Sequence, residues 1–154
     1  MNPNPQAAQN YLRMRVMTAT PEQLQMLLYD GAIRFAEQAK AALLERNFEK
    51  SYNSISRVQK ILTEMSCTLK HDVFPELCGK LASLYSFAYR KLIDANINHS
   101  VESVDEALNV LRYQRETWAL LLDHLGKSKA AVAATRIEMP APSHRMEATI
   151  SMHG

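Results

Sequence analysis

The sequence predicts an all-α protein, an antiparallel up-down four-helix bundle with an N-terminal arm and a disordered C-terminal tail. Apolar residues recur every three or four positions over long stretches, and no run shows the alternation of a half-buried β-strand. Only one proline and two glycines interrupt the chain between Pro21 and Gly126. Because the predicted connections span only a few residues, consecutive helices should be antiparallel neighbours.

The predicted bundle forms one domain, residues 1–126, in which residues 1–19 are the arm, and residues 127–154 are the tail. Residues 1–10 mix Asn, Pro, Gln and Ala without periodicity, so we expect them to be mobile. The stretch from Tyr11 to Thr18 is more apolar and is predicted to be a short helix or an extended arm. It is too short to be a stable helix by itself. We expect it to dock on apolar surface that the bundle leaves open.

The first long helix is predicted from Pro21 to Leu44. Thr20 is its N-cap, and Gln23 completes a capping box with it. Its predicted inward face is Leu24, Leu28, Gly31, Phe35, Ala39 and Ala42, with further apolar residues around the helix at Met26, Tyr29, Ile33 and Leu44. A helix that packs against the core on one side needs a narrower apolar stripe than this one. The helix is therefore either central in the bundle or half of a groove for a partner's helix.

Two amphipathic helices follow. Asn47 is the predicted N-cap of the second, whose core positions are Phe48, Tyr52, Ile55, Val58, Leu62, Met65 and Leu69. Pro75 marks the first turn of the third. Its inward stripe is Leu77, Leu81, Leu84, Ala88, Leu92 and Ala95, and Tyr89 and Ile93 lie partly off that stripe.

The fourth helix is capped by Ser100 or by Ser103, which has Glu106 three residues later. Its core face is Val104, Leu108, Leu111, Trp118, Leu122 and Leu125, and a thinner second stripe holds Val110, Tyr113 and Leu120. Gly126 is the predicted end of this helix. We expect disorder after it.

Composition narrows the class of protein. The 154 residues are 47% apolar and 22% charged, as in a soluble globular domain. The excess positive charge lies after Gly126, which argues against a nucleic-acid-binding fold. The sequence shows no signal peptide and no apolar run approaching about 18 residues, so we expect a cytoplasmic protein without membrane insertion. Cys67 and Cys78 should remain thiols.

The residue pattern does not indicate catalysis. No Glu-x-x-His pair for a di-iron centre, nucleophile elbow, glycine-rich phosphate loop or HExxH zinc motif is present. His71 and His99 fall in predicted turns and His124 near a helix end, as ordinary surface residues do. We therefore expect neither an enzyme nor a metal or cofactor site. The spare apolar stripes favour a binding protein.

Several segments of the chain match the pattern of a known protein family. Tyr11 and Val16 precede the runs Thr18–Leu24 and Met26–Phe35. These runs are similar to the signature of the FliS family of flagellar export chaperones. The segments Leu81–Tyr85 and Arg90–Ile97 agree in order and spacing. The resemblance covers roughly Tyr11 to Leu125. The connection at residues 71–79 and the tail after Gly126 depart from the family pattern. We therefore infer no partner contact from the resemblance in these two segments.

The resemblance implies a helical chaperone that binds the C-terminal segment of newly made flagellin in the bacterial cytosol. It would prevent premature polymerisation and deliver flagellin to the flagellar type III export apparatus. Export gate components are further candidate partners, and a homodimer is left open. The alternative is a self-associating bundle with a structural or regulatory role and no flagellin binding.

The candidate partner-binding residues combine the resembling segments with the apolar positions outside the core stripes. They are Tyr11, Val16, Thr18, Met26, Leu27, Tyr29, Gly31, Ile33, Tyr85, Tyr89, Ile93, Asn96, Val110 and Tyr113.

Overall fold

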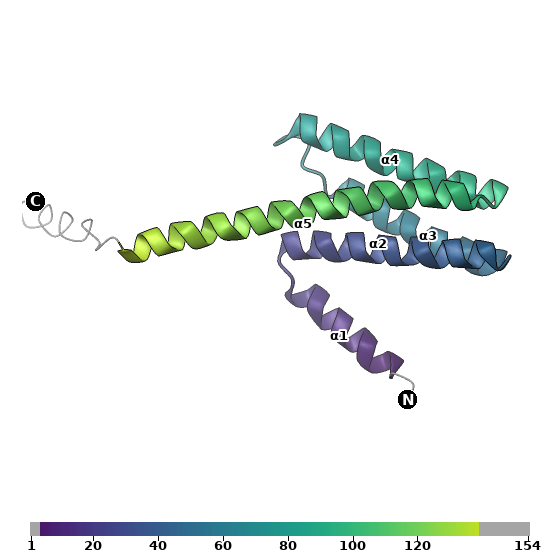
Figure 1. Cartoon of the computed structure of the whole chain (residues 1–154), viewed down its shortest axis with the longest axis horizontal. Coiled ribbons are helices and arrows are strands. Elements are labelled where there is room, and N and C mark those ends of the chain that lie inside the picture. Colours follow the sequence, from purple (N-terminus) through teal and green to yellow (C-terminus); the bar gives the residue numbers. More distant parts are fainter. Residues whose placement is uncertain (1–3, 139–154) are drawn as a thin grey trace, which may run out of the picture. The chain divides into compact units, whose positions relative to one another are not determined.

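The computed structural model describes the backbone of residues 4–138 and the side chains of residues 4–127. This part of the chain is all-helical (Figure 1), as the sequence predicts, with α1 (Pro5–Thr18), α2 (Pro21–Leu44), α3 (Phe48–Cys67), α4 (Pro75–Asn98) and α5 (Val101–Glu138). The chain divides into two compact units, Met1–Trp118 and Ala119–Gly154. The packing described below belongs to the first unit.

Side-chain caps fix where the helices begin, and most match the sequence predictions. Thr20 Oγ1 accepts a hydrogen bond from the Gln23 N–H (3.2 Å), and Gln23 Oε1 accepts one from the Thr20 N–H (3.1 Å). Asn47 Oδ1 accepts the Lys50 N–H at 3.2 Å. Ser100 Oγ accepts the Ser103 N–H at 3.1 Å, so α5 begins at the earlier of the two predicted positions.

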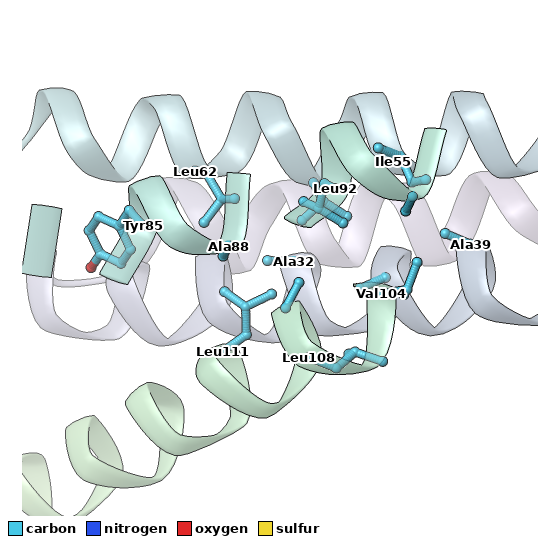
Figure 2. Packing of buried hydrophobic residues seen from close by; sticks show 14 of the residues in the cluster. Ala32, Ala39, Ile55, Leu62, Tyr85, Ala88, Leu92, Val104, Leu108 and Leu111 are labelled. Carbon is cyan, nitrogen blue, oxygen red and sulfur yellow. The ribbon is translucent and has the colours of Figure 1, made fainter. Parts of the chain in front are cut away.

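The core lies between α2, α3, α4 and the first part of α5. Helix α2 contributes mainly small side chains, and the other three helices contribute larger ones. Figure 2 shows side chains from these helices directed toward one another, among them Ala32, Ala39, Ile55, Leu62, Leu92, Leu108 and Leu111. Helix α2 packs against α3 and contributes to a core shared with α4 and α5, as the central-helix interpretation expects. Its larger apolar residues are only half-buried, namely Leu24, Met26, Leu27, Leu28, Ile33 and Phe35.

Ion pairs mark the antiparallel register of α5. Lys40 Nζ lies 2.8 Å from Asp105 Oδ1, and Arg115 Nε lies 2.5 Å from Asp30 Oδ1, so residue numbers rise along α5 as they fall along α2. Lys91 and Glu106 join α4 to α5 at 2.8 Å. These pairs are partly exposed, so each contributes little stability but helps to fix the register.

Two predictions about the ends of the chain are wrong. Gly126 does not end a helix, because it lies inside α5 without a positive φ and α5 continues to Glu138. Residues 127–138 are rich in Ala, Lys and other good helix formers, which offset the cost of one glycine. Residues 5–10 are helical, with Asn4 as the N-cap and Pro5 in the first turn. The predicted disorder of residues 139–154 lies outside the described residues.

Replacing Gly126 with alanine should stabilise this part of α5 by up to about 1 kcal/mol, because a methyl group at this position meets nothing within 4 Å and alanine favours a helix. Amide hydrogen exchange around residue 126 should slow by up to about fivefold. Gly126→Pro should accelerate it. Faster exchange in the alanine variant would indicate that Gly126 adopts a left-handed, helix-ending conformation.

Candidate partner-binding surface

One end of the bundle carries an open apolar pocket of roughly 310 Å³. It forms where α2 begins, α3 ends and α4 begins. Hydrogen bonds from the Val73 and Phe74 N–H groups to the Lys70 carbonyl (3.2 and 3.1 Å) close the turn between α3 and α4. The lining residues are Pro21, Glu22, Gln25, Thr68, Leu69, Lys70, Phe74, Leu77, Cys78, Leu81 and Trp118.

The edge of this pocket exposes large apolar side chains. Phe74 immediately precedes α4 and Leu77 lies in its first turn, and the two side chains are 60% and 56% exposed. Trp118 enters from α5, and its indole N–H donates to the Glu22 carbonyl oxygen at 3.0 Å. The tryptophan ring is thereby held beside the beginning of α2. The pocket can accept apolar side chains without prior rearrangement of its tryptophan.

A polar cluster adjoins the pocket. Gln25, which lines the pocket, donates from Nε2 to the Tyr85 hydroxyl at 3.3 Å. The Tyr85 and Tyr29 hydroxyls are hydrogen-bonded at 2.9 Å, and both residues are buried. Burial, followed by the hydrogen bond with Tyr29, raises the pKa of Tyr85 and keeps it neutral. These bonds satisfy polar groups that would otherwise be costly to bury.

A second apolar surface runs along α4. Tyr89, Ile93 and Ile97 recur at four-residue spacing, which places them on one side of the helix, and they are 37%, 40% and 71% exposed. Lys91, which pairs with Glu106, marks the side of α4 that faces α5. Tyr89 and Ile93 lie two residues to either side of Lys91 and so project nearly opposite to it. This stripe is available to a partner.

Helix α1 does not dock on the bundle as expected, because none of its residues is buried. Its large apolar side chains are exposed, namely Tyr11, Leu12, Met14, Val16 and Met17. At 100° per residue they fall all around the helix rather than on one side. Without a single apolar stripe, α1 has no preferred face to pack against the bundle.

The family model described as "Flagellar protein FliS" matches residues 4–124, which include α1–α4 and the bundle part of α5. The chain belongs to the FliS family. FliS proteins are chaperones and not enzymes.

Curated relatives carry the name flagellar secretion chaperone FliS. The Bacillus subtilis protein is 30% identical over 115 residues, covering 75% of this chain and 84% of the relative. The Escherichia coli protein is 28% identical over 112 residues, covering 72% of this chain and 82% of the relative. A solved structure titled as a flagellar chaperone from bacteria matches with a TM-score of 0.64 at 20% identity, over 79% of this chain and 99% of that one. At 20% identity, this structural match shows a shared fold and nothing about the role.

Other features of this FliS chain fit the helical fold without adding a site. Among the described residues, no helix has both the length and the apolar character needed to cross a membrane. Within the same residues, no group of three or more His, Cys, Asp or Glu side chains is placed to hold a metal ion. Cys67 is exposed and Cys78 is buried, and both are free thiols.

Three of the predicted partner-binding residues of this FliS chain lie in the core. Tyr29 and Tyr85 are 2% and 1% exposed. Gly31 is buried, and a Cβ there would lie 3.4 Å from Ile61 Cδ1 of α3, which is an ordinary van der Waals contact. In this structure each of the three is covered by the bundle itself.

The remaining predicted residues of the FliS chain are accessible but scattered. The half-buried residues are Met26, Leu27, Ile33, Asn96 and Val110, and the exposed residues are Tyr11, Val16, Thr18, Tyr89, Ile93 and Tyr113. Only Tyr89 and Ile93 join the α4 stripe. The pocket residues Phe74, Leu77 and Trp118 were not among the predicted binding residues. Two apolar residues close to Pro75 and a predicted turn were a signal that could have indicated Phe74 and Leu77, but not Trp118.

Proposed function

We propose that the chain is a cytosolic chaperone for flagellin. It binds the C-terminal segment of newly made flagellin, prevents premature polymerisation and delivers the subunit to the flagellar type III export apparatus. The observation that carries this proposal is the open apolar pocket at the end of the bundle, which is lined by Phe74, Leu77 and Trp118. Membership of the FliS family, whose curated members are named flagellar secretion chaperones, supports the role.

The pocket and the α4 stripe suit an amphipathic segment that is disordered until it binds. Such a segment places apolar anchors at helical spacing into an apolar groove. Each large anchor that becomes buried contributes about 1.5–3 kcal/mol before costs. Ordering the segment offsets part of that gain. A few anchors therefore provide moderate affinity, which suits a chaperone that must release its substrate at the export apparatus.

Self-association is a second candidate, and the exposed apolar side chains of α1 favour it. A homodimer would cover α1, whereas a flagellin complex would occupy the pocket and the α4 stripe. Export gate components are further candidate partners of the loaded chaperone. Size-exclusion chromatography with and without flagellin separates the two candidates. A self-associating chain elutes as an oligomer without flagellin, whereas a flagellin chaperone changes its elution volume only when flagellin is added.

Replacing Leu77 with serine should weaken binding of a labelled flagellin C-terminal peptide by about tenfold or more, measured by fluorescence anisotropy. The fold should persist, because Leu77 is 56% exposed. Leu44→Ser is the matched control, since Leu44 is 65% exposed and lies roughly 35 Å away along α2. Equal binding by Leu77→Ser and the native chain, or equal loss in both variants, would contradict the assignment of the pocket.

A further inference from the structure

The seam between α2 and α3 holds two cations against one aromatic ring. The guanidinium carbons of Arg34 on α2 and Arg57 on α3 each lie 5.1 Å from the centre of the Phe35 ring. The two charges are therefore no farther apart than twice that distance. Neither arginine forms an ion pair with a carboxylate in the part of the chain that the structure describes.

The neighbouring seams have matched charges. Between α2 and α5, Lys40 pairs with Asp105, Arg112 with Glu37 and Arg115 with Asp30, at 2.5 to 2.8 Å. Lys91 pairs with Glu106 between α4 and α5. Among the described side chains, the α2–α3 seam thus differs from the two seams of α5, because it brings cations from both helices together without an ion pair to a carboxylate.

An open polar pocket of roughly 380 Å³ adjoins Arg57. It is lined by Gln38, Asn47, Glu49, Lys50, Asn53, Ser54 and Arg57, with the buried Ser54 among them. The Asn47 side chain already caps α3. The lining holds two cations, Lys50 and Arg57, and a single carboxylate, Glu49, together with amide groups that can donate hydrogen bonds.

We propose that the α2–α3 seam is a docking surface for an acidic segment of a partner protein. Arginine guanidinium groups bind carboxylates through paired hydrogen bonds, and stacking on Phe35 limits their freedom before binding. The partner's carboxylates pair with Arg34, Arg57 and Lys50, and its backbone lies along the seam.

The spacing of the cations favours a peptide over a small anion. Lys50 and Arg57 are seven residues apart on α3, which is roughly 10 Å along the helix axis. Carboxylates three residues apart on an extended chain are separated by roughly the same distance. This surface is at the end of α3 opposite the apolar pocket, so the proposal does not depend on flagellin binding.

The probe is a fluorescein-labelled peptide of repeated Glu-Gly-Gly units, compared by anisotropy at low salt with the same peptide carrying Gln for Glu. The native chain should bind the Glu peptide and not the Gln peptide. Arg34→Gln with Arg57→Gln should weaken binding by about tenfold or more, because two ion pairs are lost. The control, Lys80→Gln with Arg90→Gln, removes two exposed cations of α4 that form no ion pair within the described residues, and should change affinity less than about twofold.

Equal weakening in both double variants would overturn the proposal, since net charge alone would explain it. Equal binding of the two peptides would also overturn it. Displacement of the Glu peptide by inorganic phosphate, but not by chloride at equal ionic strength, would indicate a small-anion site instead. Should the Arg→Gln pair unfold the chain, Arg34→Lys with Arg57→Lys keeps the charge and must still weaken binding measurably, because lysine lacks the paired donors.

Discussion

Replacing Leu92 with alanine is expected to lower the free energy of unfolding by about 2–5 kcal/mol. Leu92 lies on α4 with 0% of its surface exposed, in the core cluster shared by all four bundle helices (Figure 2). The loss has two parts, the transfer free energy of the removed carbons and the cavity that remains.

Urea unfolding followed by circular dichroism measures this effect. Ile97→Ala is the control on the same helix, because Ile97 is 71% exposed and its loss should change the stability by no more than about 0.5 kcal/mol. A Leu92→Ala cost close to that of the control would mean that α4 does not pack its Leu92 side into the bundle.

Tyr85→Phe is the second substitution with a large expected effect, a loss of about 1–3 kcal/mol. The aromatic ring stays in place, so no large cavity forms. The loss arises because the buried Tyr29 hydroxyl and the Gln25 amide each lose the Tyr85 hydroxyl as a hydrogen-bond partner. Tyr29→Phe together with Tyr85→Phe should cost less than the two single substitutions combined, since neither hydroxyl is then left unpaired.

A double-mutant cycle in urea gives the coupling between the two tyrosines, expected at about 0.5–3 kcal/mol. Alkaline pH provides an independent measurement. The folded-state pKa of Tyr85 lies above the ordinary value of 10.0, so its contribution is fully present below pH 10.0 and is lost as the pH rises further. The single Tyr85→Phe variant should lose less stability above pH 10.0 than the native chain does. Additive costs and identical alkaline behaviour would contradict a buried tyrosine pair.

Local rules recovered most of the fold. Thr20, Asn47 and Pro75 indicated helix starts because capping depends on a few adjacent residues. The core face of α2 was placed less well. Its predicted inward face gave weight to Leu24, Leu28 and Phe35, which are half-buried, whereas Tyr29, Ala32 and Ala36 occupy the centre. Periodicity favours large apolar residues, but a helix that shares one core with three others needs small residues where their side chains converge.

The candidate surface was less predictable than the fold. Resemblance to a family signature selected Tyr29, Gly31 and Tyr85, and such segments are shared for packing as well as for binding. The apolar pocket combines residues from the beginnings of α2 and α4, the end of α3 and Trp118 of α5. No local pattern predicts which of these distant segments converge. The exposure of Tyr52, predicted as core but 60% exposed, has the same origin, because the width of a helix's buried stripe depends on its neighbours.

The position of Trp118 gives the chain an intrinsic optical reporter. It is the only tryptophan, and its indole group lines the apolar pocket while donating to the Glu22 carbonyl. Emission from an indole shifts to shorter wavelength when water around it is replaced by apolar groups. Filling of the pocket by a ligand that lacks tryptophan should therefore be visible without any label. The same signal follows the joining of α5 to the beginning of α2 during refolding, so assembly and substrate capture can be timed by one spectroscopic change.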